Sequence, residues 1–203
     1  MIDSHHPLLL GSGSPRRLEI LRTLRLPVVA VAAQANEEPL ANERADDYLP
    51  RIVREKLASV ASHARPKNAG AVLVADTIVV LDHEILGKPC DEAHAREMLA
   101  CLSGRPHEVW TRFALASGDA PATPMHEETV RTAVYFRNLS EAEIHGYAAT
   151  GEGLDKAGAY AVQGLGSFAV RRIEGSYGNV VGLPACEVVS ALLGTRLLGR
   201  YPT

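Results

Sequence analysis

Short apolar runs alternate along this chain with segments whose apolar residues recur every three or four positions. Runs rich in β-branched residues predict buried strands, and the three-to-four spacing predicts amphipathic helices. We expect strands at 7–10, 28–33, 71–81, 107–117, 127–136 and 168–173. We expect helices at 15–24, 42–64, 91–102, 140–149 and 184–198.

Local signals mark where several of these elements begin. Ser14 followed by Pro15 is typical of a helix start, with Ser as the N-cap and Pro in the first turn. Ser140 and Glu143 have the spacing of a capping box. Pro50 lies inside the predicted helix at 42–64, and it should either kink that helix or mark its true beginning.

The order of the elements predicts the fold class. Strand–helix–strand order comes first, and strands with an antiparallel appearance follow, which together favour an α/β fold with a mixed sheet. No repeat, low-complexity tract or long linker divides the sequence. We therefore expect a single domain over residues 1–203.

Composition narrows the class of protein without indicating its chemistry. The chain carries 21 Lys and Arg against 24 Asp and Glu, and this net charge of −3 argues against a general nucleic-acid binder. No apolar run approaches the ~18 residues of a membrane span, and the polar start lacks the pattern of a secretory signal. Three cysteines without a C-x-x-C pair suit a reducing compartment. We therefore expect a cytoplasmic protein without membrane or nucleic-acid partners.

The segment 11–17, Gly-Ser-Gly-Ser-Pro-Arg-Arg, is the first candidate site. It leads from a strand through a turn of small residues to a helix start that carries Arg16 and Arg17. The N–H groups and the dipole of a helix start attract anions, and arginine offers paired donors to phosphate oxygens. The spacing is neither a dinucleotide fingerprint nor a P-loop. A capped surface helix with solvated arginines is an equally good interpretation of this pattern alone.

Asp76 interrupts the otherwise apolar run at 71–81. Burying an unpaired carboxylate costs on the order of several kcal/mol. We therefore expect Asp76 to bind a metal, to pair with a cation, or to lie where the strand meets a cleft. A structural ion pair, or a bend between two shorter strands, is the alternative.

Several other charged residues become candidates because they could lie near Asp76. A hairpin around 82–84 would return Lys88 to the Asp76 strand, where a lysine can contact the carboxylate or a substrate phosphate. Lys56, on the predicted helix at 42–64, is a second lysine of this kind. Glu37 or its neighbour Glu38 could join Asp76 around Mg²⁺, a cation that prefers oxygen ligands. Each of these charges taken alone is typical of a solvated surface.

A second candidate region, 155–164, combines glycines with Tyr160 and Gln163. An aromatic ring and a side-chain amide suit recognition of a planar group by stacking and two-way hydrogen bonding. An ordinary loop and strand would have the same composition. Ser12 and Ser14 have no histidine partner at a recognisable position, so a Ser-His-Asp site is disfavoured.

Together these segments resemble the Maf-like (septum formation inhibitor) nucleotide pyrophosphatases over about residues 8–193. The resemblance depends on several motifs in a fixed order. They are the segment 11–17, Glu37, Arg-Glu-Lys at 54–56, Ala-Asp-Thr at 75–77, Gly-Lys-Pro at 87–89, Leu-Ser-Gly at 102–104 with His107, Asp-Lys-Ala-Gly at 155–158 with Gln-Gly at 163–164, and Gly-Ser-Tyr-Gly-Asn-Val-Val-Gly-Leu-Pro at 175–184. Each motif is weak by itself, and their order makes the resemblance specific.

The resemblance implies hydrolysis of a nucleoside triphosphate between the α and β phosphates, with a divalent metal cation, Mg²⁺ or Mn²⁺, as cofactor. Asp76 would be the base or a metal ligand, and Glu37 would help to hold the metal or position water. Lys56 and Lys88 would neutralise phosphate charge and complete the catalytic set. The triphosphate-binding residues implied are Ser12, Ser14, Arg16 and Arg17.

The resemblance also implies which nucleotides are hydrolysed. Thr77 after the aspartate and the Asp-Lys-Ala-Gly…Gln-Gly form are similar to the branch that acts on dTTP and UTP. Thr77 and Gln163 thereby join the substrate-binding set, and together with Arg17 they are the implied specificity positions. The Gln163 amide offers a donor and an acceptor to a pyrimidine edge. Asn36 stands where many relatives have an acidic residue, which bears on the metal affinity.

Two alternatives stay open at this point. One is the same chemistry on 7-methyl-GTP or another modified nucleotide, and the other is a non-catalytic regulator of cell division. From the resemblance we also expect a mixed, twisted sheet flanked by helices in an inosine-triphosphatase-like fold. Two lobes of one domain would surround a central substrate cleft, and the protein would be a homodimer.

Overall fold

The computed structural model describes residues 1–63 and 68–202 of the chain. The strands are β1 (Leu8–Gly11), β2 (Val28–Val31), β3 (Ala71–Leu81), β4 (Glu84–Leu86), β5 (Pro106–Ser117), β6 (Pro124–Phe136) and β7 (Val170–Glu174). The helices are α1 (Pro15–Thr23), α2 (Ala45–His63), α3 (Glu92–Leu102), α4 (Glu141–Ala148), α5 (Tyr177–Val181) and α6 (Ala185–Gly194). Two 3₁₀ turns occupy Ala157–Ala159 and Leu165–Ala169.

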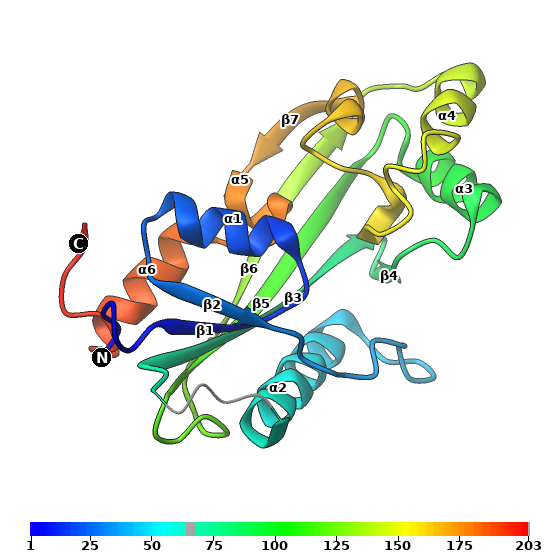
Figure 1. Cartoon of the computed structure of the whole chain (residues 1–203). Coiled ribbons are helices and arrows are strands. Elements are labelled where there is room, and N and C mark those ends of the chain that lie inside the picture. The colour runs from blue at the N-terminus through cyan, green and yellow to red at the C-terminus, as the bar shows by residue number, and fades with distance from the viewer. Residues whose placement is uncertain (64–67, 203) are drawn as a thin grey trace. The chain divides into compact units, whose positions relative to one another are not determined.

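The strands form a mixed sheet. Their order is β2-β1-β3-β5-β6-β7, and β4 pairs with β3 beside this path. β2 and β3 run parallel to β1, whereas β4 is antiparallel to β3 and β7 is antiparallel to β6. The predicted mixed sheet flanked by helices is confirmed (Figure 1).

The chain divides into two compact units. Unit 1 consists of Met1–Asp76, Thr111–Thr129 and Gly182–Thr203, and unit 2 consists of Thr77–Trp110 and Val130–Val181. The long strands β3, β5 and β6 each pass from one unit into the other. The expectation of two lobes around a central cleft stays a prediction.

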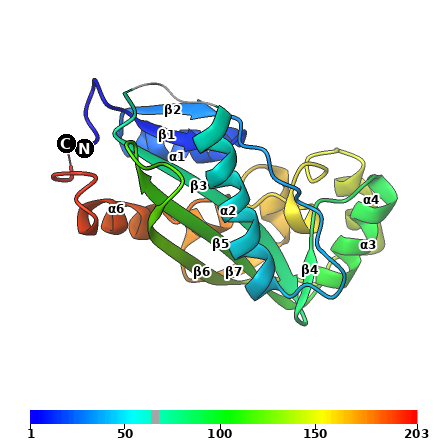
Figure 2. The ribbon, with the colours of Figure 1, turned by 90° about the horizontal axis from the view of Figure 1, so that it is seen from below.

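Unit 1 is built on β1, β2, the first half of β3 and the adjoining parts of β5 and β6. α1 and α2 lie on opposite faces of these strands, with α6 on the α1 side (Figures 1 and 2). The core beneath α2 consists of aliphatic residues that are at most 2% exposed, namely Leu9, Val53, Leu57, Val60, Val72, Val74, Ala114 and Ala116. Burial of each Val or Leu contributes roughly 1.5–3 kcal/mol, so this packing holds α2 against the sheet.

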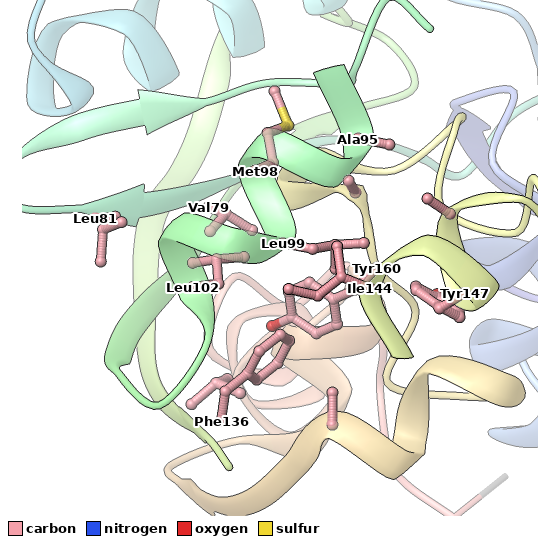
Figure 3. Close-up of a cluster of buried hydrophobic side chains, with 14 of the residues drawn as sticks. Val79, Leu81, Ala95, Met98, Leu99, Leu102, Phe136, Ile144, Tyr147 and Tyr160 are labelled. Carbon is pink, nitrogen blue, oxygen red and sulfur yellow. The ribbon is translucent and has the colours of Figure 1, made fainter. Parts of the chain in front are cut away.

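Unit 2 has a core of its own between α3, α4 and its strands. In Figure 3, Leu99, Ile144 and Phe136 gather around the ring of Tyr160. The His107 ring meets the rings of Phe136 and Tyr160 edge-on, and its Nε2 lies 2.8 Å from Tyr160 Oη. The segment around Tyr160 is therefore anchored in the core of this unit.

The local start and turn signals are confirmed. Ser14 is the N-cap of α1 with Pro15 as the first helical residue, and Ser140 and Glu143 form a complete capping box at α4. The β3–β4 hairpin turns at Asp82 and His83, whose φ angles of 50° and 73° are both positive. Two positive φ angles are characteristic of the tight hairpin turn that matches the strand twist.

The predicted helix at 42–64 begins later than expected. It starts at Ala45, because Asn42 has a φ of 58° and so cannot belong to a right-handed helix. Pro50 lies inside the helix and does not mark its start. The predicted end at 64 lies outside the described residues.

Other boundaries predicted towards the end of the chain are also wrong. The last helix ends at Gly194 instead of 198, because Arg196 has a φ of 58° just after the cap at Thr195. The strand expected from 168 begins at Val170, since Phe168 belongs to a 3₁₀ turn. α5 was not expected, since its five residues are too few for helical periodicity to be recognised.

Candidate functional site

The turn between β1 and α1 is held together by Ser12 and Arg17. Ser12 Oγ accepts hydrogen bonds from the Ser14 backbone N at 3.2 Å and from Arg17 Nη1 at 3.0 Å. Arg17 Nε donates to the Gly182 carbonyl at 2.8 Å. Ser12 and Arg17 are each only 8% exposed. Arg17 therefore ties this turn to the residues that precede α6.

The close approach of α2 to this turn requires glycine at position 11. A Cβ atom on Gly11 would lie 2.5 Å from Val60 Cγ2 and 2.8 Å from Val74 Cγ1. Real carbon atoms do not approach so closely, so a larger residue would push α2 away from β1 and β3. The small residue at the end of β1 thus serves packing beside the candidate anion site.

The start of α1 has the features of an anion site. The Ser14 hydroxyl accepts no capping hydrogen bond from the helix, and Arg16 is half-buried in the first turn. Burial lowers the pKa of the Arg17 guanidinium, and the nearby charges of Asp76 and Glu37 oppose this shift. An arginine remains charged in spite of such shifts. Two guanidinium groups and the positive end of the helix dipole therefore meet at this turn.

Lys56 joins Asp76 and Glu37. Its Nζ lies 2.5 Å from Asp76 Oδ1 and 2.8 Å from Glu37 Oε1. Lys56 and Asp76 are 5% and 7% exposed, whereas the Glu37 side chain is 43% exposed. Of the three environments expected for Asp76, the structure shows pairing with a cation.

The packing of α2 on β3 explains why Lys56 meets Asp76. Side chains two apart in a strand share a face, so Asp76 follows Val72 and Val74 on the face that α2 covers. Side chains three and four apart share a face of a helix, which groups Lys56 with Val53 and Val60. The same apolar contacts that bury α2 therefore bring its one buried lysine to the aspartate.

The loop that carries Glu37 is fixed to the first turns of α2. Tyr48 Oη donates to the Glu37 carbonyl at 2.9 Å, and the Asn36 backbone N donates to Glu55 Oε2 at 3.1 Å. Burial raises the pKa of Tyr48, and the negative charges of Asp76 and Glu37 raise it further. The phenol therefore keeps the proton that it donates.

Arg51 is the second anchor of this loop. Its Nη1 donates to the Asn36 carbonyl at 3.2 Å and its Nη2 donates to the Glu38 carbonyl at 3.1 Å. Two bonds of 2.6 Å to Glu43 and one of 3.2 Å to Glu55 fix the guanidinium itself. The backbone on both sides of Glu37 is thereby held.

Sequence reasoning did not identify Tyr48 and Arg51 as residues of the site. Tyr48 fits the apolar face of α2, and it is indeed 4% exposed. The spacing of Arg51 and Glu55 indicates an ion pair within a helix. No sequence signal indicates the backbone carbonyl groups that these two side chains contact.

Three of the predicted site residues belong to unit 2. Thr77 is half-buried and directly follows Asp76 in β3. Lys88 is exposed two residues beyond the end of β4, and Gln163 is exposed between the two 3₁₀ turns. The hairpin expected to return Lys88 is present, while the grouping of these three residues with those of unit 1 stays a prediction.

No group of three or more His, Cys, Asp or Glu side chains within the described part of the chain could hold a metal ion by itself. Asp76 and Glu37 are the two carboxylates that meet at one point, on Lys56 Nζ. In the same described part of the chain, no helix is both long and apolar enough to span a membrane.

Comparison with known proteins shows extensive similarity. A family model described as Maf-like protein matches residues 7–195. A dTTP/UTP pyrophosphatase of Myxococcus xanthus (strain DK1622) is 50% identical over 188 residues, covering 91% of this chain and 90% of that protein. A dTTP/UTP pyrophosphatase of Geotalea uraniireducens (strain Rf4) is 46% identical over 192 residues, covering 95% and 96%. A nucleoside triphosphate pyrophosphatase of Haemophilus ducreyi (strain 35000HP / ATCC 700724) is 42% identical over 190 residues, covering 93% and 94%.

Among solved structures, a nucleoside-triphosphatase / dITP/XTP pyrophosphatase of Mycobacterium abscessus is similar with a TM-score of 0.41 and 17% identity, covering 93% of this chain and 95% of that one. This likeness is weak, and the assignment of a mixed sheet depends on the strand pairing alone.

Proposed function

Because this chain belongs to the Maf-like protein family, we propose that it hydrolyses dTTP and UTP to the nucleoside monophosphate and pyrophosphate. Relatives named dTTP/UTP pyrophosphatase, 46% and 50% identical over almost the whole chain, support this substrate class. The observation that carries the proposal is the buried contact of Lys56 with Asp76 and Glu37. The cellular role would be removal of unwanted nucleotides from the pool.

The proposed reaction needs a base, a positively charged binding site and a fixed geometry. Asp76 would either accept the proton of the water that attacks the α-phosphorus or hold the metal that activates this water. The negative charge of the triphosphate would be offset by the start of α1 and by Arg16 and Arg17. Lys88 would offset the charge of the leaving pyrophosphate. Lys56 holds the Asp76 carboxylate in one orientation. Catalysis would then consist mainly of positioning and electrostatic stabilisation.

The donor set fits a divalent cation such as Mg²⁺ or Mn²⁺. Asp76 and Glu37 supply hard oxygen ligands and both contact Lys56 Nζ, and Mg²⁺ typically takes one or two carboxylates together with substrate phosphates and water. We therefore infer that these two residues hold the metal. When bound, it would offset negative charge on the phosphate oxygens.

We propose that Thr77, Gln163 and Arg17 determine which nucleobase is selected. The exposed Gln163 amide suits direct hydrogen bonding to a pyrimidine edge. Arg17 is buried and bonded to Ser12 and to the Gly182 carbonyl. Its contribution to selectivity would therefore come through the shape of the turn at 11–17.

The first test measures pyrophosphate release from a nucleotide panel in the presence of Mg²⁺ or Mn²⁺. The panel contains dTTP, UTP, CTP, GTP and 7-methyl-GTP. We expect release from dTTP and UTP, and loss of the carboxylate in Asp76→Asn should lower kcat by about 100-fold or more. The matched control is Asp119→Asn in the exposed loop between β5 and β6, which should retain wild-type rates.

Each other outcome of this experiment has a defined meaning. Preference for 7-methyl-GTP would assign the chain to the same chemistry on modified nucleotides. No turnover of any nucleotide would contradict an enzymatic function and favour a regulator of cell division.

A homodimer and a cytoplasmic location also belong to the proposal, and light scattering after gel filtration would test the dimer.

A further inference from the structure

Glu152 lies at the centre of a hydrogen-bond network that the proposed mechanism does not use. Its Oε1 accepts a hydrogen bond from the Leu165 backbone N at 3.0 Å. Its Oε2 accepts bonds from the Gly166 backbone N and from Tyr147 Oη, each at 2.8 Å. All of these residues belong to unit 2. One carboxylate thus holds one end of the segment 161–166.

Tyr147 holds the other end of the same segment. Its Oη accepts a hydrogen bond from the Ala161 backbone N at 3.0 Å while donating to Glu152. Tyr147 is 5% exposed in α4 and belongs to the core cluster of Figure 3. Gln163 lies between the two anchored ends, and its side chain is exposed.

The backbone of this segment packs directly against the two anchoring side chains. A Cβ atom on Gly164, whose φ is 81°, would lie 2.4 Å from Glu152 Oε1. A Cβ atom on Gly166 would lie 2.5 Å from Tyr147 Oη. Only glycine allows this approach and the positive φ at position 164. The path of the segment is therefore determined by Glu152 and Tyr147.

The charge of Glu152 strengthens these contacts. Burial raises the pKa of Glu152, but the backbone N–H groups of Gly166 and Leu165 and the Tyr147 hydroxyl outweigh burial, so the pKa is lowered overall. The carboxylate is therefore ionised at neutral pH. Hydrogen bonds to an ionised acceptor are about twice as strong as neutral ones.

The residue before the segment is fixed independently. The Tyr160 ring is 5% exposed within the core cluster (Figure 3), and its Oη pairs with His107 Nε2 at 2.8 Å. Tyr160 directly precedes Ala161. The chain on both sides of Gln163 is thus bound to buried groups, which limits the positions that the Gln163 amide can take.

We propose that Glu152 is a positioning residue that sets nucleobase selectivity by holding the segment 161–166, and with it Gln163, in one conformation. The inference depends on the proposed function and deepens it, because it explains how a selective amide is kept in place on an exposed loop. Glu152 itself contacts no reacting atom in this scheme.

The main test compares Glu152→Gln with wild type. The amide has nearly the same shape, but it loses the charge and presents an NH₂ group to one of the backbone N–H donors. We expect the ratio of kcat/KM for UTP over CTP to fall by about fivefold or more, as expected for loss of one or two hydrogen bonds. The kcat for UTP at saturation should change by less than about twofold, because the catalytic residues are untouched.

A matched control is Glu141→Gln, which changes the same residue type at the exposed start of α4. The Glu141 side chain is 93% exposed and lies 3.9 Å from His145. Its UTP/CTP ratio should equal that of wild type. Tyr147→Phe is a second variant, which keeps the ring and removes the hydroxyl. It should lower the ratio in the same direction, and it keeps the inference testable if Glu152→Gln does not fold.

A double-mutant cycle distinguishes positioning from general damage. If Glu152 acts through Gln163, then Glu152→Gln should cause no further loss of selectivity in a Gln163→Ala background. Three results would each overturn the inference. They are additive losses of selectivity in the double mutant, an unchanged UTP/CTP ratio in folded Glu152→Gln, and equal losses of activity on all nucleotides.

Hydrogen exchange supplies a measurement that does not depend on catalysis. The amides of Ala161, Leu165 and Gly166 should exchange faster in Glu152→Gln, while those of α3 keep their wild-type rates. Unchanged exchange at these three amides would also overturn the inference. If the wild-type protein hydrolysed no nucleotide, the proposed function would fail, and the selectivity comparison would use equilibrium binding of UTP and CTP.

Discussion

At the scale of single residues, Lys56 explains how a carboxylate can occupy the middle of a buried strand. Removing the partner of a buried charge typically costs about 3–5 kcal/mol, and Asp76 has its partner at 2.5 Å. Glu37 places a second carboxylate on the same ammonium at 2.8 Å. The hard oxygen atoms of these two carboxylates are the chemical basis for the proposed metal.

Arg51 allows the importance of the Glu37 loop to be tested. Arg51→Lys keeps the positive charge but cannot reproduce the five donors that now reach Glu43, Glu55 and two loop carbonyls. We expect kcat/KM for dTTP to fall about tenfold, since small displacements of catalytic groups are costly. Steady-state kinetics would measure this change. Arg96→Lys, a surface change that affects only a pair with Glu92, should leave the rate unaltered, and an equal effect of both variants would contradict the assigned role.

At the scale of elements, α2 determines most of the candidate site in unit 1. One face of the helix packs on β1 and β3 and brings Lys56 to Asp76. Its first turns provide Tyr48 and Arg51, which hold the loop of Glu37. In unit 2, α4 has a comparable role, because it carries Tyr147 and is itself stabilised by a capping box.

The capping box of α4 predicts a measurable contribution to stability. Ser140 Oγ accepts from the Glu143 backbone N at 3.3 Å, and Glu143 Oε2 accepts from the Ser140 backbone N at 2.8 Å. Ser140→Ala should lower the free energy of unfolding by about 1 kcal/mol. Urea unfolding would show this as a lower midpoint.

The control for this prediction is Ser62→Ala. Ser62 is exposed in α2, and its hydroxyl donates to the carbonyl groups of Ala58 and Ser59 in its own helix. Alanine is the better helix former at such a position, so this variant should be at least as stable as wild type. A loss of stability as large as that of Ser140→Ala would argue against the capping contribution.

At the scale of the whole molecule, stability should depend on pH through His107. Burial lowers the pKa of His107 to about 4 from an ordinary value of 6.5. The unfolded chain therefore binds more protons than the folded protein between these values, and the free energy of unfolding falls as the pH falls from 6.5 towards 4. The shift corresponds to about 3 kcal/mol.

Urea unfolding of wild type and His107→Gln at several pH values between 7 and 4 would measure this effect. Carboxylates titrate in the same range, so the comparison concerns the slopes of the two proteins. We expect a shallower dependence in His107→Gln, whereas the exposed His5→Gln should keep the wild-type slope. Identical slopes in all three proteins would show that His107 does not carry the effect.

Several features in and around the candidate site were predictable because their signals are local. The turn of small residues before Pro15, the capping box at Ser140 and the charge within the apolar strand at Asp76 each involve neighbouring positions in the sequence. Local patterns also predicted the strands and helices and the mixed sheet, because periodicity decides which face of an element is buried. Two of the wrong boundaries arose where positive φ angles at Asn42 and Arg196 ended regular structure, and a third arose where a 3₁₀ turn replaced the expected start of β7. The pattern of apolar residues encodes neither feature.

The sequence by itself determined most of the elements, the mixed sheet, the position of the anomalous charge and the ordered motifs of the family. Only the tertiary structure decided the partners: Lys56 meets Asp76 across 20 residues, Arg17 meets Gly182 across 165, and Glu152 meets Gly166 through the path of a loop. The physical reason is that hydrogen bonds and ion pairs depend on distances of about 3 Å. Those distances arise only after the apolar faces have packed, so they depend on all elements at once.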